Sequence, residues 1–156
     1  MSLPSSSSSG AAGIEIFNTR VFDAPCPTVF NAFADPAQLA RWWGPNGFTN
    51  TIKTFDLHPG GTWRLIMHGP NGADFENVSR FVEVVAPKKI VYDHLQPMHH
   101  FRMTMTYDEV AGGQTRLTWR MHFEKTAENE KLKDVLAAAN EQNFDRLAAW
   151  LQTLQP

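Results

Sequence analysis

The sequence has 156 residues and a formal net charge of −2, with 42% hydrophobic and 19% charged residues. This length and composition are typical of one globular domain with a full-sized core, and they exclude wholesale disorder. The charge gives no electrostatic basis for binding nucleic acid or an anionic membrane, and no segment has the ~18 consecutive apolar residues of a membrane-spanning helix.

The N-terminal end is set apart by its composition. Residues 1–13 include five consecutive serines and are expected to form a flexible leader, either native or left over from cloning. They lack the basic and apolar regions of a secretory signal, so we expect a cytoplasmic protein. Residues 14–156 are expected to form a single domain.

The first part of this domain is predicted to be one strand and two short helices. Residues 14–23 are rich in β-branched and aromatic side chains, which favours a strand. The helices follow over 27–35 and 36–43, each with a proline in its first turn, where the missing N–H needs no partner. Asp35 is expected to cap the second helix, and a turn rich in glycine and proline over 44–47 ends it.

Six further strand-like segments follow, separated by turns that contain glycine or proline. They span residues 48–58, 62–68, 73–85, 88–95, 99–110 and 114–124. Gly112 and Gly113, between the last two, are a hairpin signature. One face of these two strands would carry Phe101, Met103, Met105, Tyr107, Leu117, Trp119, Met121 and Phe123. Such alternation predicts antiparallel strands with one covered and one wet face.

Residues 127–155 change to a helical pattern. The apolar stripe contains Leu132, Leu136, Ala139, Leu147, Trp150 and Leu154, with Val135, Phe144 and Leu151 at its margins. The order of elements predicts an α+β helix-grip fold. In this fold a curved antiparallel sheet of about seven strands, with two short helices, wraps a long C-terminal helix around an apolar pocket.

Four stretches of the sequence together resemble one known family. They lie at residues 27–45, 60–72, 81–92 and 140–147. In this order they resemble the AHSA-like family, homologues of the activator of the 90-kilodalton heat-shock protein ATPase, within the START-like (SRPBCC) superfamily. The resemblance covers about residues 14–154.

The resemblance implies a birch-pollen-allergen-like fold with a cavity between sheet and long helix, often used for hydrophobic small molecules. The superfamily also holds lipid carriers, hormone receptors, polyketide cyclases and chaperone regulators, so fold alone does not fix function. Eukaryotic chaperone activators carry a further N-terminal domain with no counterpart here, which argues against a chaperone partner.

The candidate ligand site is the apolar face that the strands would turn toward the long helix. Its predicted members are Trp42, Trp63, Met67, Phe101, Met103, Met105, Trp119, Met121, Asn143 and Phe144. Methionine is flexible and suits a surface that accepts varied ligands. Asn143 lies in the apolar stripe, where a buried amide needs a partner: a strand side chain, a water or the ligand. A filled core under the helix is the alternative to a pocket.

No catalytic residue, metal site or cofactor is predicted, because no motif for one is present. His99 and His100 would point to opposite faces of a strand, which argues against a shared metal. Cys26, the only cysteine, excludes an intrachain disulfide and a cysteine-cluster metal site, and it indicates a packing role. A pocket-facing His94 or His68 is the candidate for an acid or base.

The leading hypothesis is therefore a non-catalytic or weakly catalytic binder of a small hydrophobic molecule or lipid, with no nucleic-acid partner and no membrane insertion. One alternative is an enzyme of the polyketide cyclase type, in which a pocket histidine assists proton transfer. A second alternative is a protein-interaction module, such as a chaperone regulator, with an exposed patch as its site. Trp42 and Trp43 are candidates for closing one end of the pocket, or for a lid or a homodimer contact.

Overall fold

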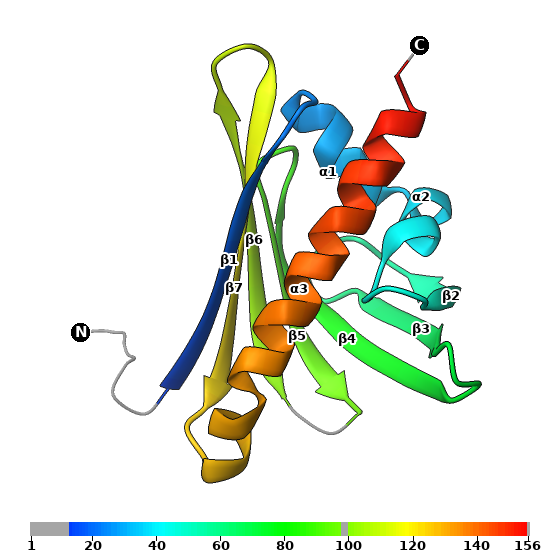
Figure 1. Cartoon of the computed structure of the whole chain (residues 1–156), viewed down its shortest axis with the longest axis vertical. Coiled ribbons are helices and arrows are strands. Elements are labelled where there is room, and N and C mark those ends of the chain that lie inside the picture. The colour runs from blue at the N-terminus through cyan, green and yellow to red at the C-terminus, as the bar shows by residue number, and fades with distance from the viewer. Residues whose placement is uncertain (1–12, 98–99, 156) are drawn as a thin grey trace.

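The computed structural model describes residues 13–97 and 100–155, which form one curved sheet and three helices (Figure 1). The strands are β1 (Gly13–Phe22), β2 (Thr49–Phe55), β3 (Thr62–His68), β4 (Asp74–Val85), β5 (Lys89–Gln96), β6 (Phe101–Val110) and β7 (Gln114–Glu124). The helices are α1 (Cys26–Ala34), α2 (Pro36–Trp42) and α3 (Ala127–Thr153). The predicted leader, apart from Gly13, and His99 lie outside the described residues.

The seven strands form one antiparallel sheet in the order β1-β7-β6-β5-β4-β3-β2. Each of the strands from β2 to β6 pairs with the strand that follows it in the chain. The first strand, β1, pairs with the last strand, β7. In the β6–β7 hairpin, Val110 is opposite Gln114, and Gly112 and Gly113 have φ angles of 83° and 74° that favour glycine. The α+β helix-grip prediction and the predicted hairpin are confirmed.

The two faces of the sheet differ as the alternation predicts. On the concave face the buried side chains of β6 and β7 are Met103, Met105, Tyr107, Leu117, Trp119, Met121 and Phe123. The opposite face carries exposed ion pairs, such as Arg102 with Asp93 (Nε to Oδ1, 2.8 Å). The hydrophobic core therefore lies between the concave face and the helices.

The two short helices pack against each other and against the sheet. The Asp35 carboxylate accepts a hydrogen bond from the backbone N–H of Ala37 at 3.0 Å, so the predicted cap of α2 is confirmed. The Trp42 indole N–H donates to the carbonyl oxygen of Ala32 at 2.9 Å, which fixes α2 on α1. Trp42 and Trp43 are both buried within the chain, so neither has the exposure that a lid or a dimer contact needs.

Helix α3 crosses the concave face of the sheet, with α1 and α2 beside its C-terminal half (Figure 1). It begins after Thr126, whose hydroxyl accepts from the backbone N–H of Asn129 at 3.0 Å. Its buried residues, Asn143, Phe144, Leu147 and Leu151, all lie in the C-terminal half. Among the described residues, no helix is long and apolar enough to cross a membrane.

The buried face of α3 differs from the predicted apolar stripe. Phe144 and Leu151, predicted at the margins, are fully or almost fully buried, whereas Leu154 is 43% exposed just beyond the last turn. Val135 is 64% exposed. The sequence pattern assumes uniform packing along the helix, but here only the C-terminal half packs closely on the sheet.

Cys26 is a packing residue, as predicted. It is buried at the start of α1, and the Thr115 hydroxyl lies 3.6 Å from its sulfur atom. The same hydroxyl donates to the carbonyl oxygen of Ala24 at 2.7 Å, so the contact ties the β1–α1 connection to β7.

Candidate ligand-binding site

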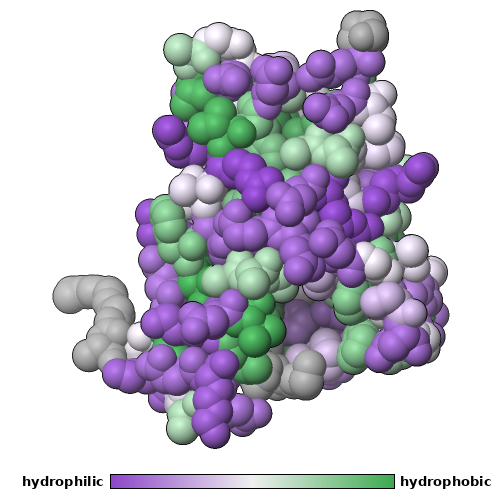
Figure 2. All heavy atoms as spheres, viewed as in Figure 1, coloured by the Kyte–Doolittle hydropathy of each residue, from purple (hydrophilic) through white to green (hydrophobic). Residues whose placement is uncertain are grey.

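A pocket of about 350 Å³ lies between the concave face of the sheet and α3. Figure 2 shows a hollow on this side of the molecule, beside the N-terminal half of α3 and over β4 and β5. Three parts of the fold line the pocket: strands β3 to β7, the segment between α2 and β2, and α3. The volume is within the range of small-molecule sites.

The strands supply the first wall in register. Trp63 of β3 is opposite Ser79 of β4, Ser79 is opposite His94 of β5, and His94 is opposite Phe101 of β6. The His94 and Phe101 rings are stacked with their centroids 4.7 Å apart, and His94 Nε2 lies 3.1 Å from the carbonyl oxygen of Pro97. The rest of this wall contains Leu65, Met67, Phe75, Asn77, Tyr92, Pro97, Met103, Trp119, Met121 and Phe123.

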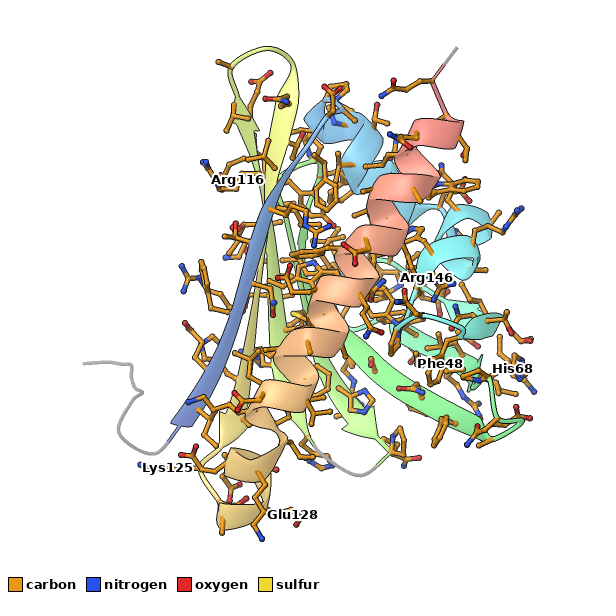
Figure 3. All side chains as sticks on the ribbon, in the orientation of Figure 1. Phe48, His68, Arg116, Lys125, Glu128 and Arg146 are labelled. Carbon is orange, nitrogen blue, oxygen red and sulfur yellow. The ribbon has the colours of Figure 1, made fainter. Side chains whose placement is uncertain are left out.

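The segment between α2 and β2 supplies the second wall, and Arg146 of α3 holds it in place. Nη1 of Arg146 donates to the carbonyl oxygens of Trp43 (2.9 Å), Gly44 (3.0 Å) and Pro45 (3.0 Å), and Nη2 donates to that of Phe48 (2.8 Å). Figure 3 shows Arg146 beside α3, facing the segment that carries Phe48. Partial burial lowers the pKa of this guanidinium. The carbonyl dipoles around the guanidinium compensate for the hydration that it loses on burial.

Gly44 is required at its position in this wall. Its φ angle is +97°, a left-handed value that other residues adopt rarely. A Cβ atom there would lie 2.8 Å from the terminal methyl carbon of Met67 and 3.3 Å from Cβ of Phe48. The absent side chain leaves room for Met67 to lie against the segment.

Helix α3 supplies the third wall with Leu136, Ala139, Asn140 and Asn143. The Asn143 amide donates to the carbonyl oxygen of Trp42 at 2.9 Å. Asn140 donates to the Asn18 side-chain oxygen of β1 at 3.0 Å. The partner of Asn143 is thus the backbone at the end of α2, which the sequence-based alternatives did not include.

Seven of the ten predicted site residues lie together in the pocket wall: Trp63, Met67, Phe101, Met103, Trp119, Met121 and Asn143. The other three are buried outside it. Trp42 is bonded to Ala32, Met105 is fully buried, and the Phe144 ring packs between Phe22 (5.6 Å) and Trp119 (4.7 Å). On α2 it is Trp42's neighbour, Trp43, that reaches the pocket, with its ring 5.2 Å from that of Trp63.

The sequence analysis missed the polar side chains that β4 places in the wall. Asn77 and Ser79 are two residues apart and line the pocket, and Ser79 is only 2% exposed. Alternation along β4 places them on the same face as Phe75, which also lines the pocket, and buried Phe81. The sequence signal that could have revealed these two residues was a strand with polar side chains at the positions of its covered face.

Among the lining residues that the structure describes, none is Asp, Glu, Lys or Arg, and the His94 imidazole is the one basic side chain. Burial raises the pKa of the Tyr92 phenol well above its ordinary value, so this hydroxyl stays protonated. The indole N–H groups of Trp63 and Trp119 are buried without a hydrogen-bond partner among the described residues. The wall therefore combines aromatic and methionine surface with uncharged polar groups.

Of the two candidate acid–base histidines, only His94 lines the pocket. His68 is the last residue of β3 and lies away from α3 (Figure 3). Its Nδ1 is 2.7 Å from a carboxylate oxygen of Asp74, and its Nε2 is 2.8 Å from the hydroxyl of Thr51. Within residues 13–97 and 100–155, no three His, Cys, Asp or Glu side chains are grouped to hold a metal ion.

Comparison with known families gives a match over most of the chain. The family of the activator of Hsp90 ATPase homolog 1-like proteins matches residues 23–152. The chain belongs to this family. The match includes α1, α2, the three walls of the pocket and nearly all of α3. No curated protein matches the chain.

Solved structures of similar proteins share the fold of this family member. A protein from Arthrobacter aurescens, solved by NMR, is 24% identical with a TM-score of 0.81, over 89% of this chain and 86% of that one. A crystal structure from Nitrosomonas europaea is 20% identical with a TM-score of 0.78, over 90% and 96% of the two chains. One from Chromobacterium violaceum is 25% identical with a TM-score of 0.73, over 88% and 96%.

Proposed function

We propose that this protein binds a small hydrophobic molecule in the pocket between the sheet and α3. The observation that carries the proposal is the wall itself, in which the rings of Trp43, Trp63 and Trp119 and three methionines surround about 350 Å³ of space. Binding sites for small molecules are concave and mostly apolar, with a few placed polar groups. Membership of a family whose fold commonly holds hydrophobic ligands supports the same proposal.

The way α3 is held also supports binding in this pocket. The C-terminal half is anchored on the sheet by Phe144, Leu147 and Leu151, and Arg20 of β1 pairs with Glu141 at 2.9 Å. No residue in the N-terminal half of α3 is buried as fully as these three. Because segments with few buried contacts open most readily, we propose that a ligand enters beside the N-terminal half of α3.

Two alanines on α3 give a matched test of the proposal. Ala139 lines the pocket, whereas its neighbour Ala138 is exposed to solvent. Binding of the uncharged fluorescent probe N-phenyl-1-naphthylamine is measured for both phenylalanine variants. Ala139→Phe fills the pocket and is expected to weaken binding about tenfold or more, which is about 1.4 kcal/mol. Ala138→Phe is expected to bind like the wild type.

Thermal melting followed by circular dichroism checks that both variants are folded. Native mass spectrometry of the wild-type protein then tests for a small molecule that copurifies with it. The proposal is wrong if the wild type neither binds the probe nor carries a ligand, or if Ala139→Phe binds the probe as tightly as Ala138→Phe.

A second candidate function, an enzyme of the polyketide cyclase type, is favoured by one observation. His94 lines the pocket, and an imidazole can accept or donate a proton near neutral pH. We propose to measure, by NMR in heavy water, the exchange of the methyl protons of 2-acetylnaphthalene. A base in the pocket would speed this exchange in the wild type but not in His94→Gln. Equal rates would leave binding as the function.

A further inference from the structure

Three uncharged polar side chains line the pocket with hydrogen-bonding capacity that no described residue uses. Ser79 and Tyr92 are each 2% exposed, and neither hydroxyl bonds to any residue that the structure describes. Asn143 is 5% exposed, and its amide nitrogen bonds to Trp42 while its side-chain oxygen has no donor among the described residues. Buried polar groups are nearly always hydrogen-bonded, to protein, water or ligand.

These three groups face the pocket from both sides. Ser79 of β4 and Tyr92 of β5 lie on the concave face of the sheet, where the register places them as diagonal neighbours. Asn143 lies across the pocket on α3. The two hydroxyls can donate or accept a hydrogen bond, and the amide oxygen can only accept.

The two arginines of α3 and β1 that lie near the pocket already have hydrogen-bond or ion-pair partners. Arg146 directs its guanidinium onto five backbone carbonyls, and Arg20 pairs with Glu141 and Asp145. Of the lining residues within 13–97 and 100–155, none is Asp, Glu, Lys or Arg. A cationic ligand would therefore lose its hydration in the pocket without gaining an opposite charge, and an anionic ligand would have only the His94 imidazole to pair with among the described lining residues.

We propose that the ligand is an uncharged molecule of fused-ring size that carries a hydroxyl group, held by Ser79 and Tyr92 on one side and by Asn143 on the other. A hydroxyl matches this arrangement because it can accept from Ser79 or Tyr92 and donate to the Asn143 oxygen. This inference rests on the proposed binding function and adds the chemical class of the ligand. A carboxylate held by His94 is the competing occupant that the experiment must separate from it.

The experiment compares three ligands with the same ring system and different charge. At pH 7.5 the uncharged 2-naphthalenemethanol, the anionic 2-naphthoate and the cationic 2-naphthylmethylammonium compete against bound N-phenyl-1-naphthylamine. The alcohol is expected to bind roughly tenfold or more tightly than either ion. Ser79→Ala is expected to weaken binding of the alcohol about threefold to tenfold more than it weakens binding of the naphthylamine.

Thr104→Ala is the control variant, because Thr104 is a hydroxyl residue on the outer face of β6 that does not line the pocket. It should bind every compound as the wild type does. Tighter binding of either ion, equal binding of all three compounds, or an unchanged affinity of Ser79→Ala for the alcohol would overturn the inference while leaving the binding function intact. Failure of naphthylamine itself to bind would overturn the binding function and this inference together.

Discussion

At the scale of single residues, Arg146 shows how one side chain can define a wall of the pocket. Its guanidinium donates to the carbonyl of Arg41 in the last turn of α2, and it gathers the carbonyls of Trp43, Gly44, Pro45 and Phe48 around the same charge. A cation at the end of a helix also interacts favourably with the helix dipole. Arg146 therefore positions the wall without itself lining the pocket.

Replacing Arg146 should destabilise the fold. Arg146→Gln is expected to lower the free energy of unfolding by about 2 kcal/mol, because several hydrogen bonds from a charged donor to partly buried carbonyls are lost. Arg146→Lys should lose less stability, because lysine keeps the positive charge although it lacks the planar guanidinium group. Urea denaturation measures both. Arg116→Gln, on the outer face of β7, is the control and should change stability by no more than about 0.5 kcal/mol. A wild-type stability for Arg146→Gln would refute the role.

At the scale of elements, α3 divides into an anchored half and a pocket half. Phe144, Leu147 and Leu151 bury the C-terminal half, and Arg20 and Asn18 of β1 bond to the middle of the helix through Glu141. Toward the N-terminus, Leu136 and Ala139 line the pocket instead of filling it. One helix therefore serves both as core and as pocket wall.

This division predicts very different losses of stability for two side-chain truncations on the same helix. Phe144→Ala removes a fully buried ring that contacts Phe22 and Trp119, and it should cost about 3–5 kcal/mol. Val135→Ala removes a side chain that is 64% exposed and should change stability by less than about 0.5 kcal/mol. Chemical denaturation of the two variants gives the comparison. Similar losses in both would show that the N-terminal half packs as tightly as the C-terminal half.

At the scale of the whole molecule, the core holds both tyrosines of the chain. Tyr92 and Tyr107 are at most 2% exposed, and burial raises the pKa of each phenol far above the ordinary value of about 10. In the unfolded chain both phenols would ionise near that ordinary value. The folded state therefore keeps two protons that the unfolded state loses at high pH.

Stability should consequently fall as the pH rises above about 10, by up to about 1.4 kcal/mol per pH unit for each tyrosine. Below the unfolded pKa both states are protonated, and this contribution to stability is fully present. Tyrosinate absorbance at 295 nm, followed together with circular dichroism, should appear only as the protein unfolds. Tyr107→Phe should halve the tyrosine-dependent part of the slope. Tyrosinate absorbance near pH 10 in folded protein would contradict the prediction.

The outline of the fold follows from the sequence because it depends on local patterns. The alternation of Met103, Met105 and Tyr107 determines which side of β6 is covered, and the glycines at 112 and 113 determine the hairpin. The position of Asn143 among apolar residues was enough to show that its amide is buried and needs a partner. Each of these inferences uses neighbours along one strand or one helix.

Whether a pocket remains under α3, and which residues complete its wall, was decided by tertiary structure. Asn143 and Arg146 bond to backbone carbonyls about a hundred residues earlier. Trp43 rather than Trp42 reaches the cavity because the indole of Trp42 is already bonded to α1. Periodicity in the sequence determines which face of an element is covered. Whether the covering elements meet or leave a space depends on contacts between distant segments, which no local pattern encodes.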